Sequence, residues 1–171
     1  MTSAKIGVLF VCHANICRSP LAEGIFAHLV RARGLADRFT IDSAGCWAQG
    51  GSDPHPLSIA AAAEHGIDLR ALVGRSRSIE PDDLHRFDHV IAMDRDNLAD
   101  LQRLRRLSAF GPVQDGKARI RLLRAIERPD VEGRDADVPD PIGRPAPVYE
   151  STYAILERAC EALLGELVGS R

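Results

Sequence analysis

The chain lacks the features that would tie it to a membrane, to nucleic acid or to an oxidising compartment. Its four cysteines have neither the spacing of a secreted disulfide framework nor that of a zinc site. No apolar run is long enough to span a bilayer, and Met1-Thr2-Ser3-Ala4-Lys5 leads into a short strand rather than a signal sequence. The formal net charge of -2 argues against a nucleic-acid partner. We therefore expect a cytoplasmic protein.

Cofactor motifs are also lacking. The six histidines are scattered without metal-ligand spacing, and no nucleotide motif of the Walker type is present. We therefore expect no metal and no other cofactor. Hydrophobic residues make up 45% and charged residues 27% of the 171 residues, a composition and length typical of one globular domain. We expect residues 1–171 to form that single domain.

The most informative stretch is residues 8–20, which begins as an apolar strand and ends as the start of a helix. Lys5 to Val11 is a nearly continuous apolar run, typical of a strand buried on both faces of a parallel sheet. Ser19-Pro20 fits an N-cap followed by proline at the first helical position. A helix start presents unpaired N–H groups and the positive end of the helix dipole to an anion. Cys12 and Arg18 lie at this turn, which predicts an oxyanion-binding loop.

The residues of this loop predict a chemistry. The helix start and the guanidinium favour the thiolate of Cys12, which is its nucleophilic form. Arg18 offers a planar fork that can hold two phosphoryl oxygens. The hydroxyl of Ser19 can donate to the sulfur as well as cap the helix. Asn15 suits a left-handed backbone. Cys17 either forms a reversible disulfide with Cys12 on oxidation or packs as a small apolar residue.

Apolar periodicity predicts the remaining elements. Strands are expected at 39–43, 87–93 and 118–123, and helices at 20–33, 57–65, 95–107 and 153–164. Ala44-Gly45 is expected to form a turn, and Asp94 to cap the helix over 95–107. We interpret residues 70–77, which carry several arginines, as a solvated surface. The irregular stretch 124–147 is too long for an idle connector and predicts a functional loop.

The long loop contains candidates for the proton donor that phosphoryl transfer from a thiolate requires. Protonation of the leaving oxygen speeds its departure, and Asp135, Asp137 and Asp140 are available. We favour Asp140, because Pro141 stiffens the chain behind it, although an Asp-Pro pair is also an ordinary turn. Trp47, in a separate Gly- and Pro-rich loop, either forms the wall of a pocket for an aromatic ring or covers the core.

The Cys12-x5-Arg18-Ser19-Pro20 pattern behind one N-terminal strand resembles the phosphate-binding loop of the low-molecular-weight protein tyrosine phosphatases. Their loop usually reads C-x-G-N-x-C-R-S, and this chain departs from it with Ala14 in place of the glycine. We expect this methyl group to modify the kinetics rather than abolish the site. Three weaker matches follow in the family's order: Ser43-Ala44-Gly45, Met93-Asp94 and Asp140-Pro141.

The resemblance implies a fold and an activity. The fold is a single-domain α/β structure of the flavodoxin-like phosphotyrosine phosphatase I type, a four-stranded parallel sheet of order 2-1-3-4 with helices on both faces. The activity is two-step hydrolysis of phosphotyrosine, in which Cys12 attacks, Arg18 holds the phosphoryl group and Asp140 serves as general acid and base. The substrates are tyrosine-phosphorylated proteins, a tyrosine kinase among the candidates, and the chain is a monomer or a weak dimer.

The resemblance also implies roles for the residues around these three. The phosphate-binding residues are His13, Ala14, Asn15, Ile16, Cys17 and Arg18. The supporting residues are Ser19, Ser43 and Asp94, and Cys17 stays the candidate redox partner that two thiols in one loop suggest. The walls of the substrate pocket are His13, Trp47 and Ile142, the last of which stands where the family commonly has an aromatic residue.

Three alternative functions remain open. A thioredoxin-coupled arsenate reductase uses a similar loop but needs a relay of two further cysteines, and Cys46 and Cys160 are isolated here. A protein-arginine phosphatase usually has threonine at the position of Ile16, and the aliphatic side chain favours an aryl ester. A non-catalytic phosphate-binding module has no need of a general acid such as Asp140.

Overall fold

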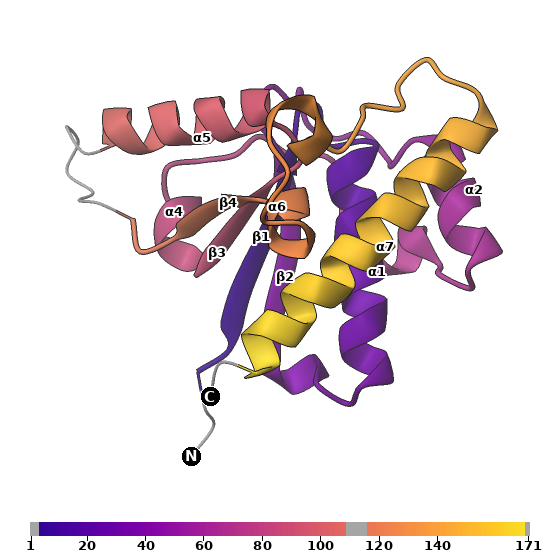
Figure 1. The fold of residues 1–171 in the computed structure, drawn as a ribbon, viewed down its shortest axis with the longest axis horizontal. Helices are drawn as coiled ribbons and strands as arrows, with labels where there is room; N and C mark the ends of the chain where they lie inside the picture. The colour runs from indigo at the N-terminus through magenta and orange to yellow at the C-terminus, as the bar shows by residue number, and fades with distance from the viewer. Residues whose placement is uncertain (1–3, 109–115, 170–171) are drawn as a thin grey trace.

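A parallel sheet forms the centre of the molecule. The computed structural model describes residues 4–108 and 116–169. Residues 1–3, 109–115 and 170–171 of the expected domain lie outside the described residues. The strands are β1 (Ile6–Cys12), β2 (Phe39–Gly45), β3 (His89–Ala92) and β4 (Arg119–Leu122). They are all parallel and lie in the order β2-β1-β3-β4 (Figure 1), which confirms the expected topology.

Helices connect the strands. They are α1 (Arg18–Ala32), η1 (Ala36–Arg38), α2 (Pro56–Glu64), α3 (Leu69–Leu72), α4 (Asp83–Arg86), α5 (Arg95–Ser108), α6 (Leu123–Glu127), η2 (Gly133–Ala136) and α7 (Ala146–Gly169). The strands and helices α1, α2 and α5 lie close to the predicted ranges, whereas α7 begins at Ala146 and ends at Gly169, well beyond the predicted 153–164. The short helices η1, α3, α4, α6 and η2 were not predicted, because so few residues carry no periodic signal. None of the helices in the described ranges is both long and apolar enough to cross a membrane.

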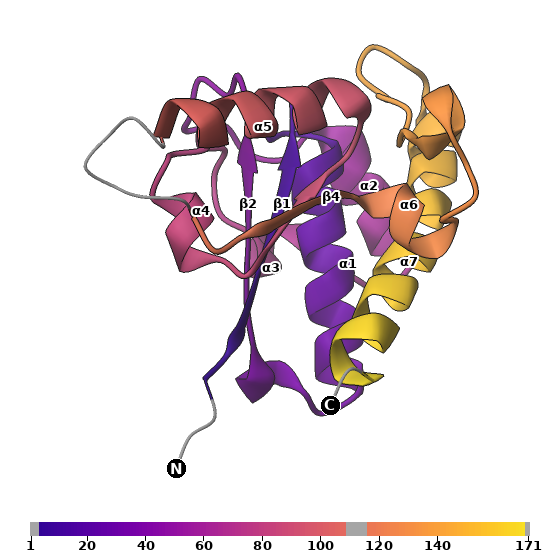
Figure 2. The same cartoon turned by 60° about the vertical axis from the view of Figure 1, so that its left-hand side comes forward.

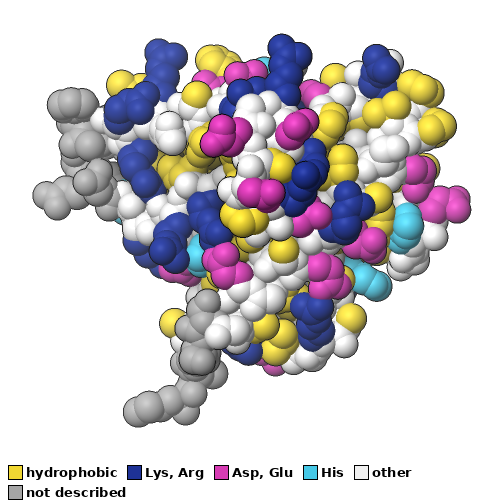
Figure 3. Space-filling view, viewed as in Figure 1, with side chains coloured by type: hydrophobic (Ala, Val, Ile, Leu, Met, Phe, Trp, Pro, Cys, Tyr) yellow, Lys and Arg dark blue, Asp and Glu magenta, His cyan; other side chains and the backbone are white. Residues whose placement is uncertain are grey.

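Two cores lie on opposite faces of the sheet. Val8 and Phe10 of β1 are fully buried against α1 and α7, whereas Leu9 and Val11 are fully buried against α4 and α5. Figure 2 shows the sheet between these two helical layers. Alternate side chains of a strand point to opposite faces, so a strand between two layers must be apolar throughout. On the face seen in Figure 3, acidic and basic side chains are interspersed.

Two local predictions are wrong. Ala44 and Gly45 do not form a turn; they continue β2, where Gly45 pairs with Cys12 of β1. Ser19 is not the N-cap of α1, because the helix begins at Arg18 and Cys17 takes the N-cap position. The helix can begin earlier because Pro20 still lies in its first turn. The backbone nitrogens of the first turn have no acceptor within the helix, so the missing N–H of proline breaks no hydrogen bond there.

Candidate active site

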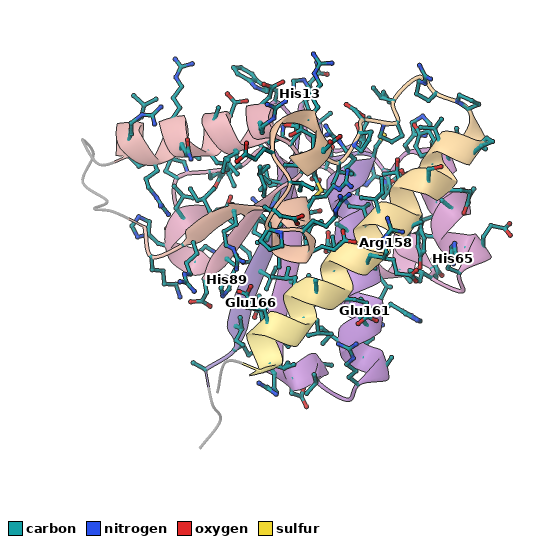
Figure 4. All side chains as sticks on the ribbon, viewed as in Figure 1. His13, His65, His89, Arg158, Glu161 and Glu166 are labelled. Carbon is teal, nitrogen blue, oxygen red and sulfur yellow. The ribbon has the colours of Figure 1, made fainter. Side chains whose placement is uncertain are left out.

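The loop after β1 carries the candidate nucleophile at the carboxyl edge of the sheet, where ligands bind in parallel α/β folds. Cys12 ends β1 and is buried. Asn15 has φ of 56°, which confirms the predicted left-handed backbone, and it is the only non-glycine residue of the described ranges with a positive φ. Ala14 therefore fits the loop without backbone strain. Figure 4 shows His13 of this loop at the upper edge of the molecule in that view.

Gly45 of β2 sets the position of this loop. A Cβ at Gly45 would lie 2.6 Å from the backbone oxygen of His13 and 2.9 Å from the backbone nitrogen of Asn15. Both atoms belong to the backbone and cannot rotate away, so any side chain at Gly45 would push the loop outward. Glycine is needed here for a close approach, not for a turn.

Hydroxyl and amide groups surround the Cys12 sulfur. The Sγ of Cys12 lies 3.0 Å from the Oγ of Ser19. The Nδ2 of Asn15 donates to the Oγ of Ser19 at 2.8 Å and to the Oγ of Ser43 at 3.0 Å. Because Ser19 accepts from the amide, its own hydrogen is available to the sulfur or to the backbone oxygen of Ala44 at 3.2 Å. This geometry places a hydroxyl where it can stabilise a thiolate.

The hydrogen-bond network extends to Glu23 of α1, which the sequence did not single out. The Oγ of Ser43 donates to the Oε2 of Glu23 at 2.6 Å, and Glu23 is only 5% exposed. Burial and nearby Asp42 raise the pKa of Glu23 to about 8, against the opposing effects of Ser43 and Arg77. A glutamate among apolar residues of α1 was the only signal, and it did not show which way the side chain points.

Arg77 holds the loop from the other side. Its backbone N–H donates to the Oδ1 of Asn15 at 2.9 Å, so the Asn15 amide uses both its donor and its acceptor atoms. The guanidinium of Arg77 pairs with Asp42 at 2.8 Å and with buried Asp83 at 2.9 Å. The predicted solvated surface over 70–77 is therefore wrong for Arg77, because the two carboxylates hold its side chain against the protein.

Arg18 lies buried between two carboxylates. Its Nη1 donates to the Oδ2 of Asp94 at 2.6 Å and to the backbone oxygen of Val138 at 3.0 Å. Its Nη2 donates to the Oδ2 of Asp140 at 3.3 Å. Burial works against the charged form of Arg18, but nearby Cys12 and Asp94 outweigh burial and raise the pKa of the guanidinium. The Oδ1 of Asp94 also accepts from the N–H of Asn97 at 2.7 Å, which confirms Asp94 as the cap of α5.

The structure separates the three acid candidates. Asp140 lines the Cys12 pocket, keeps its side chain partly exposed and accepts from the N–H of Ile142 at 3.1 Å. Asp137 instead pairs with the guanidinium of Arg95 at 3.2 Å and accepts from the Arg95 N–H at 2.9 Å. Asp135 is exposed on η2. Asp140 is thus the candidate that shares a cavity with Cys12.

The Cys12 pocket has a volume of about 50 Å³, which suits a small group such as a phosphoryl. It is lined by Cys12, His13, Ala14, Ile16, Cys17, Arg18, Asp140 and Ile142. Buried Asn15 lies behind this lining, with its side chain turned to Ser19 and Ser43. Of the expected pocket walls, His13 and Ile142 line the cavity. Trp47 is 62% exposed, so it does not cover the core, and it lines a neighbouring pocket rather than the Cys12 cavity.

The other three cysteines differ from Cys12 in their surroundings. Burial raises the pKa of the Cys17 thiol to about 11, and its sulfur lies 3.7 Å from the hydroxyl of Tyr149. Burial likewise raises the pKa of Cys46 to about 12, and Cys160 is fully buried in the core. Within residues 4–108 and 116–169, no group of three or more His, Cys, Asp or Glu side chains is arranged to hold a metal ion.

Comparison with known proteins agrees with this class of site. The family model for "Low molecular weight phosphotyrosine protein phosphatase" matches residues 7–170, and the chain belongs to this family. It is 37% identical over 160 residues to a low molecular weight protein-tyrosine-phosphatase of Streptomyces coelicolor, covering 92% of this chain and 90% of the relative. It is 36% identical over 164 residues to YfkJ of Bacillus subtilis, covering 95% of this chain and 96% of that protein.

Solved structures show the same architecture. The crystal structure of YfkJ from Bacillus subtilis matches with a TM-score of 0.81 and 32% identity, covering 100% of this chain and 99% of that one. A Drosophila arginine phosphatase matches with a TM-score of 0.80 and 30% identity, covering 94% of this chain and 96% of that one. The fold is therefore shared by proteins named as tyrosine phosphatases and by a protein named as an arginine phosphatase.

Proposed function

We propose that this protein-tyrosine phosphatase hydrolyses phosphotyrosine in the pocket at Cys12. In the first step the Cys12 thiolate attacks phosphorus, the S–P bond forms and the P–O bond to the phenol breaks. Asp140 donates its proton to the departing phenolate oxygen. In the second step the Asp140 carboxylate takes a proton from water, whose oxygen attacks phosphorus, and the S–P bond breaks to release inorganic phosphate. Arg18 holds the phosphoryl oxygens throughout.

One observation supports this proposal: a single small cavity brings together a thiol, a guanidinium and a carboxyl group. Cys12, Arg18 and Asp140 all line it, although Asp140 is distant in the sequence. The Ser19 hydroxyl, 3.0 Å from the sulfur, supports the thiolate before attack and when it departs. Ser43 and Asp94 support the loop and the clamp through their hydrogen bonds to Asn15 and Arg18.

The test is hydrolysis of p-nitrophenyl phosphate by the wild type and two variants. We expect Cys12→Ser to be inactive and Asp140→Asn to lose roughly 10²–10⁴-fold in kcat. Asp137→Asn is the matched control, because Asp137 pairs with Arg95 outside the Cys12 pocket. Full activity of Cys12→Ser would refute the covalent mechanism, and full activity of Asp140→Asn would refute the assignment of the acid. A non-catalytic phosphate-binding module would bind phosphate without any turnover.

An arginine phosphatase is the second candidate, because the chain matches the fold of the Drosophila arginine phosphatase with a TM-score of 0.80. Ile16 distinguishes the two, since it lines the pocket with an aliphatic side chain in place of the usual threonine. We expect higher kcat/KM on a phosphotyrosine peptide than on a phosphoarginine peptide. Ile16→Thr should narrow this difference, and a wild-type preference for phosphoarginine would reverse the assignment.

We further propose that the substrates are cytoplasmic phosphotyrosine proteins, a tyrosine kinase among them, and that the chain acts as a monomer or weak dimer without nucleic acid. All four cysteines are free, as is usual where thiols are kept reduced. The net charge of -2 also offers little attraction for nucleic acid. Sedimentation at micromolar concentration tests the oligomeric state. Capture of phosphoproteins from a cytosolic extract by Cys12→Ser, competed by vanadate, tests the substrate class.

A further inference from the structure

A second pocket lies beside the phosphate loop, between Trp47 and one side of α5. We name it the Trp47 pocket; its volume is about 230 Å³. Its apolar walls are Trp47, Ile79, Leu104 and Leu107, and its polar ones include Asp100 and Arg103. The volume is below the roughly 300–1,000 Å³ of sites for drug-sized ligands. The pocket therefore suits a single side chain better than a whole small molecule.

The apolar walls of this pocket are unusually exposed. The described ranges contain three exposed large hydrophobic residues, which are Trp47 at 62%, Leu107 at 61% and Ile142 at 49%. Two of them line the Trp47 pocket and the third lines the Cys12 pocket. A cluster of exposed apolar side chains beside a site marks a surface that another molecule covers.

Hydrogen bonds join the Trp47 pocket to the phosphate loop. The backbone N–H of Trp47 donates to the backbone oxygen of His13 at 2.9 Å. The indole Nε1 of Trp47 donates to the Oδ2 of Asp100 at 2.9 Å, which holds the ring against α5. The pocket wall is thus positioned before any ligand arrives, and it adjoins the place where a phosphate would bind.

The length of the Trp47 pocket along α5 fits a short stretch of extended peptide. Leu107 lies seven residues after Asp100 on α5, which at 1.5 Å per residue is roughly 10 Å along the helix. An extended peptide rises roughly 3.3 Å per residue, so about three residues cover this distance. The exposed guanidinium of Arg103 at the rim complements an acidic residue in such a peptide.

We propose that the Trp47 pocket binds an apolar side chain of the phosphoprotein substrate within a few residues of the phosphotyrosine, because the backbone of Trp47 bonds to His13 of the phosphate loop. This inference rests on the proposed function, because the occupant belongs to the same substrate as the phosphate. The Cys12 pocket recognises the phosphoryl group. The Trp47 pocket selects among phosphoproteins by an apolar residue before or after the phosphotyrosine.

Matched phosphotyrosine peptides test this selection. The kcat/KM values of peptide pairs are compared. The two peptides of a pair differ only in having leucine or alanine at one position, which lies two, three or four residues before or after phosphotyrosine. We expect leucine to be favoured about tenfold at one of these positions. Leu107→Ala should remove this preference and leave the rate on p-nitrophenyl phosphate unchanged, since that substrate has no flanking residue. Gln102→Ala, an exposed residue of α5 outside the pocket, is the control and should retain the preference.

Fluorescence gives a readout that does not depend on turnover. Trp47 is the only tryptophan of the chain, so its emission reports on this pocket. Titration of Cys12→Ser with the preferred leucine peptide should shift the emission, and the alanine peptide should shift it less. Equal kcat/KM for all peptide pairs together with equal emission shifts would overturn the inference. If the wild type hydrolyses neither p-nitrophenyl phosphate nor peptides, the proposed function fails. The emission shift still shows whether the Trp47 pocket binds the leucine side chain.

A second copy of this chain is the competing occupant. In that case the emission of Trp47 would change with protein concentration in the absence of peptide, and Leu107→Ala would abolish a dimer seen by sedimentation. That pair of results would overturn the assignment to a substrate side chain.

Discussion

Glu23→Gln is expected to remove a pH dependence from the stability of this protein. Glu23 is buried in α1 and accepts the hydrogen of Ser43 at 2.6 Å, at the end of the network that leads to Cys12. Glutamine has the same shape and keeps an oxygen that can accept from Ser43, but it cannot ionise. The substitution therefore isolates the carboxyl charge from the packing of the side chain.

The magnitude follows from the pKa of Glu23, which rises from 4.5 to about 8 because the carboxyl is buried. Below pH 4.5 the carboxyl is protonated in both the folded and the unfolded chain, so it has no effect on the free energy of unfolding. Between pH 4.5 and 8 only the unfolded chain ionises, which lowers the free energy of unfolding by about 1.4 kcal/mol per pH unit. The loss is complete above pH 8 and amounts to roughly 5 kcal/mol.

Urea unfolding of the wild type and Glu23→Gln at pH 5, 6, 7 and 8 measures this effect. The variant should gain stability over the wild type as the pH rises, by about 1.4 kcal/mol for each unit. Glu64→Gln, an exposed glutamate of α2, is the control and should show no such trend. A difference between wild type and Glu23→Gln that stays constant from pH 5 to 8 would refute the reasoning.

Three further predictions concern the phosphate loop. Gly45→Ala should lower kcat on p-nitrophenyl phosphate by roughly 10²-fold, because the added Cβ would lie 2.6 Å from the His13 backbone oxygen and displace the loop. A normal rate would show that the loop accommodates the Cβ without losing its catalytic geometry. Ser19→Ala should slow the alkylation of Cys12 by iodoacetamide at pH 6 by roughly tenfold or more, since the thiolate loses a donor at 3.0 Å, and unchanged kinetics would contradict this. Peroxide-treated wild type should recover activity with thiol, whereas Cys17→Ser should not; equal recovery would count against a protective disulfide.

Local sequence was enough to predict the segment around Cys12. The strand before Cys12 and the phosphate loop are contiguous, so apolar periodicity and the Cys12-x5-Arg18 spacing were sufficient to predict them, although α1 begins one residue earlier than its expected cap. The left-handed Asn15 and the Asp94 cap are likewise local, because the backbone conformation and the next turn of helix decide both. The sheet order came from the family resemblance, since the strand sequences alone do not state which strands are neighbours.

Contacts between residues that are distant in the sequence became known from the folded structure. It placed Asp140 in the Cys12 pocket and paired Asp137 with Arg95, although both aspartates lie in one loop with no periodic pattern. It also turned Glu23 toward Ser43 and brought Gly45 against the loop backbone. The physical reason is that short-range propensities depend on neighbours in the chain. Burial, ion pairing and close approach depend instead on which elements pack together, and packing is set by the whole sheet and its two helical layers.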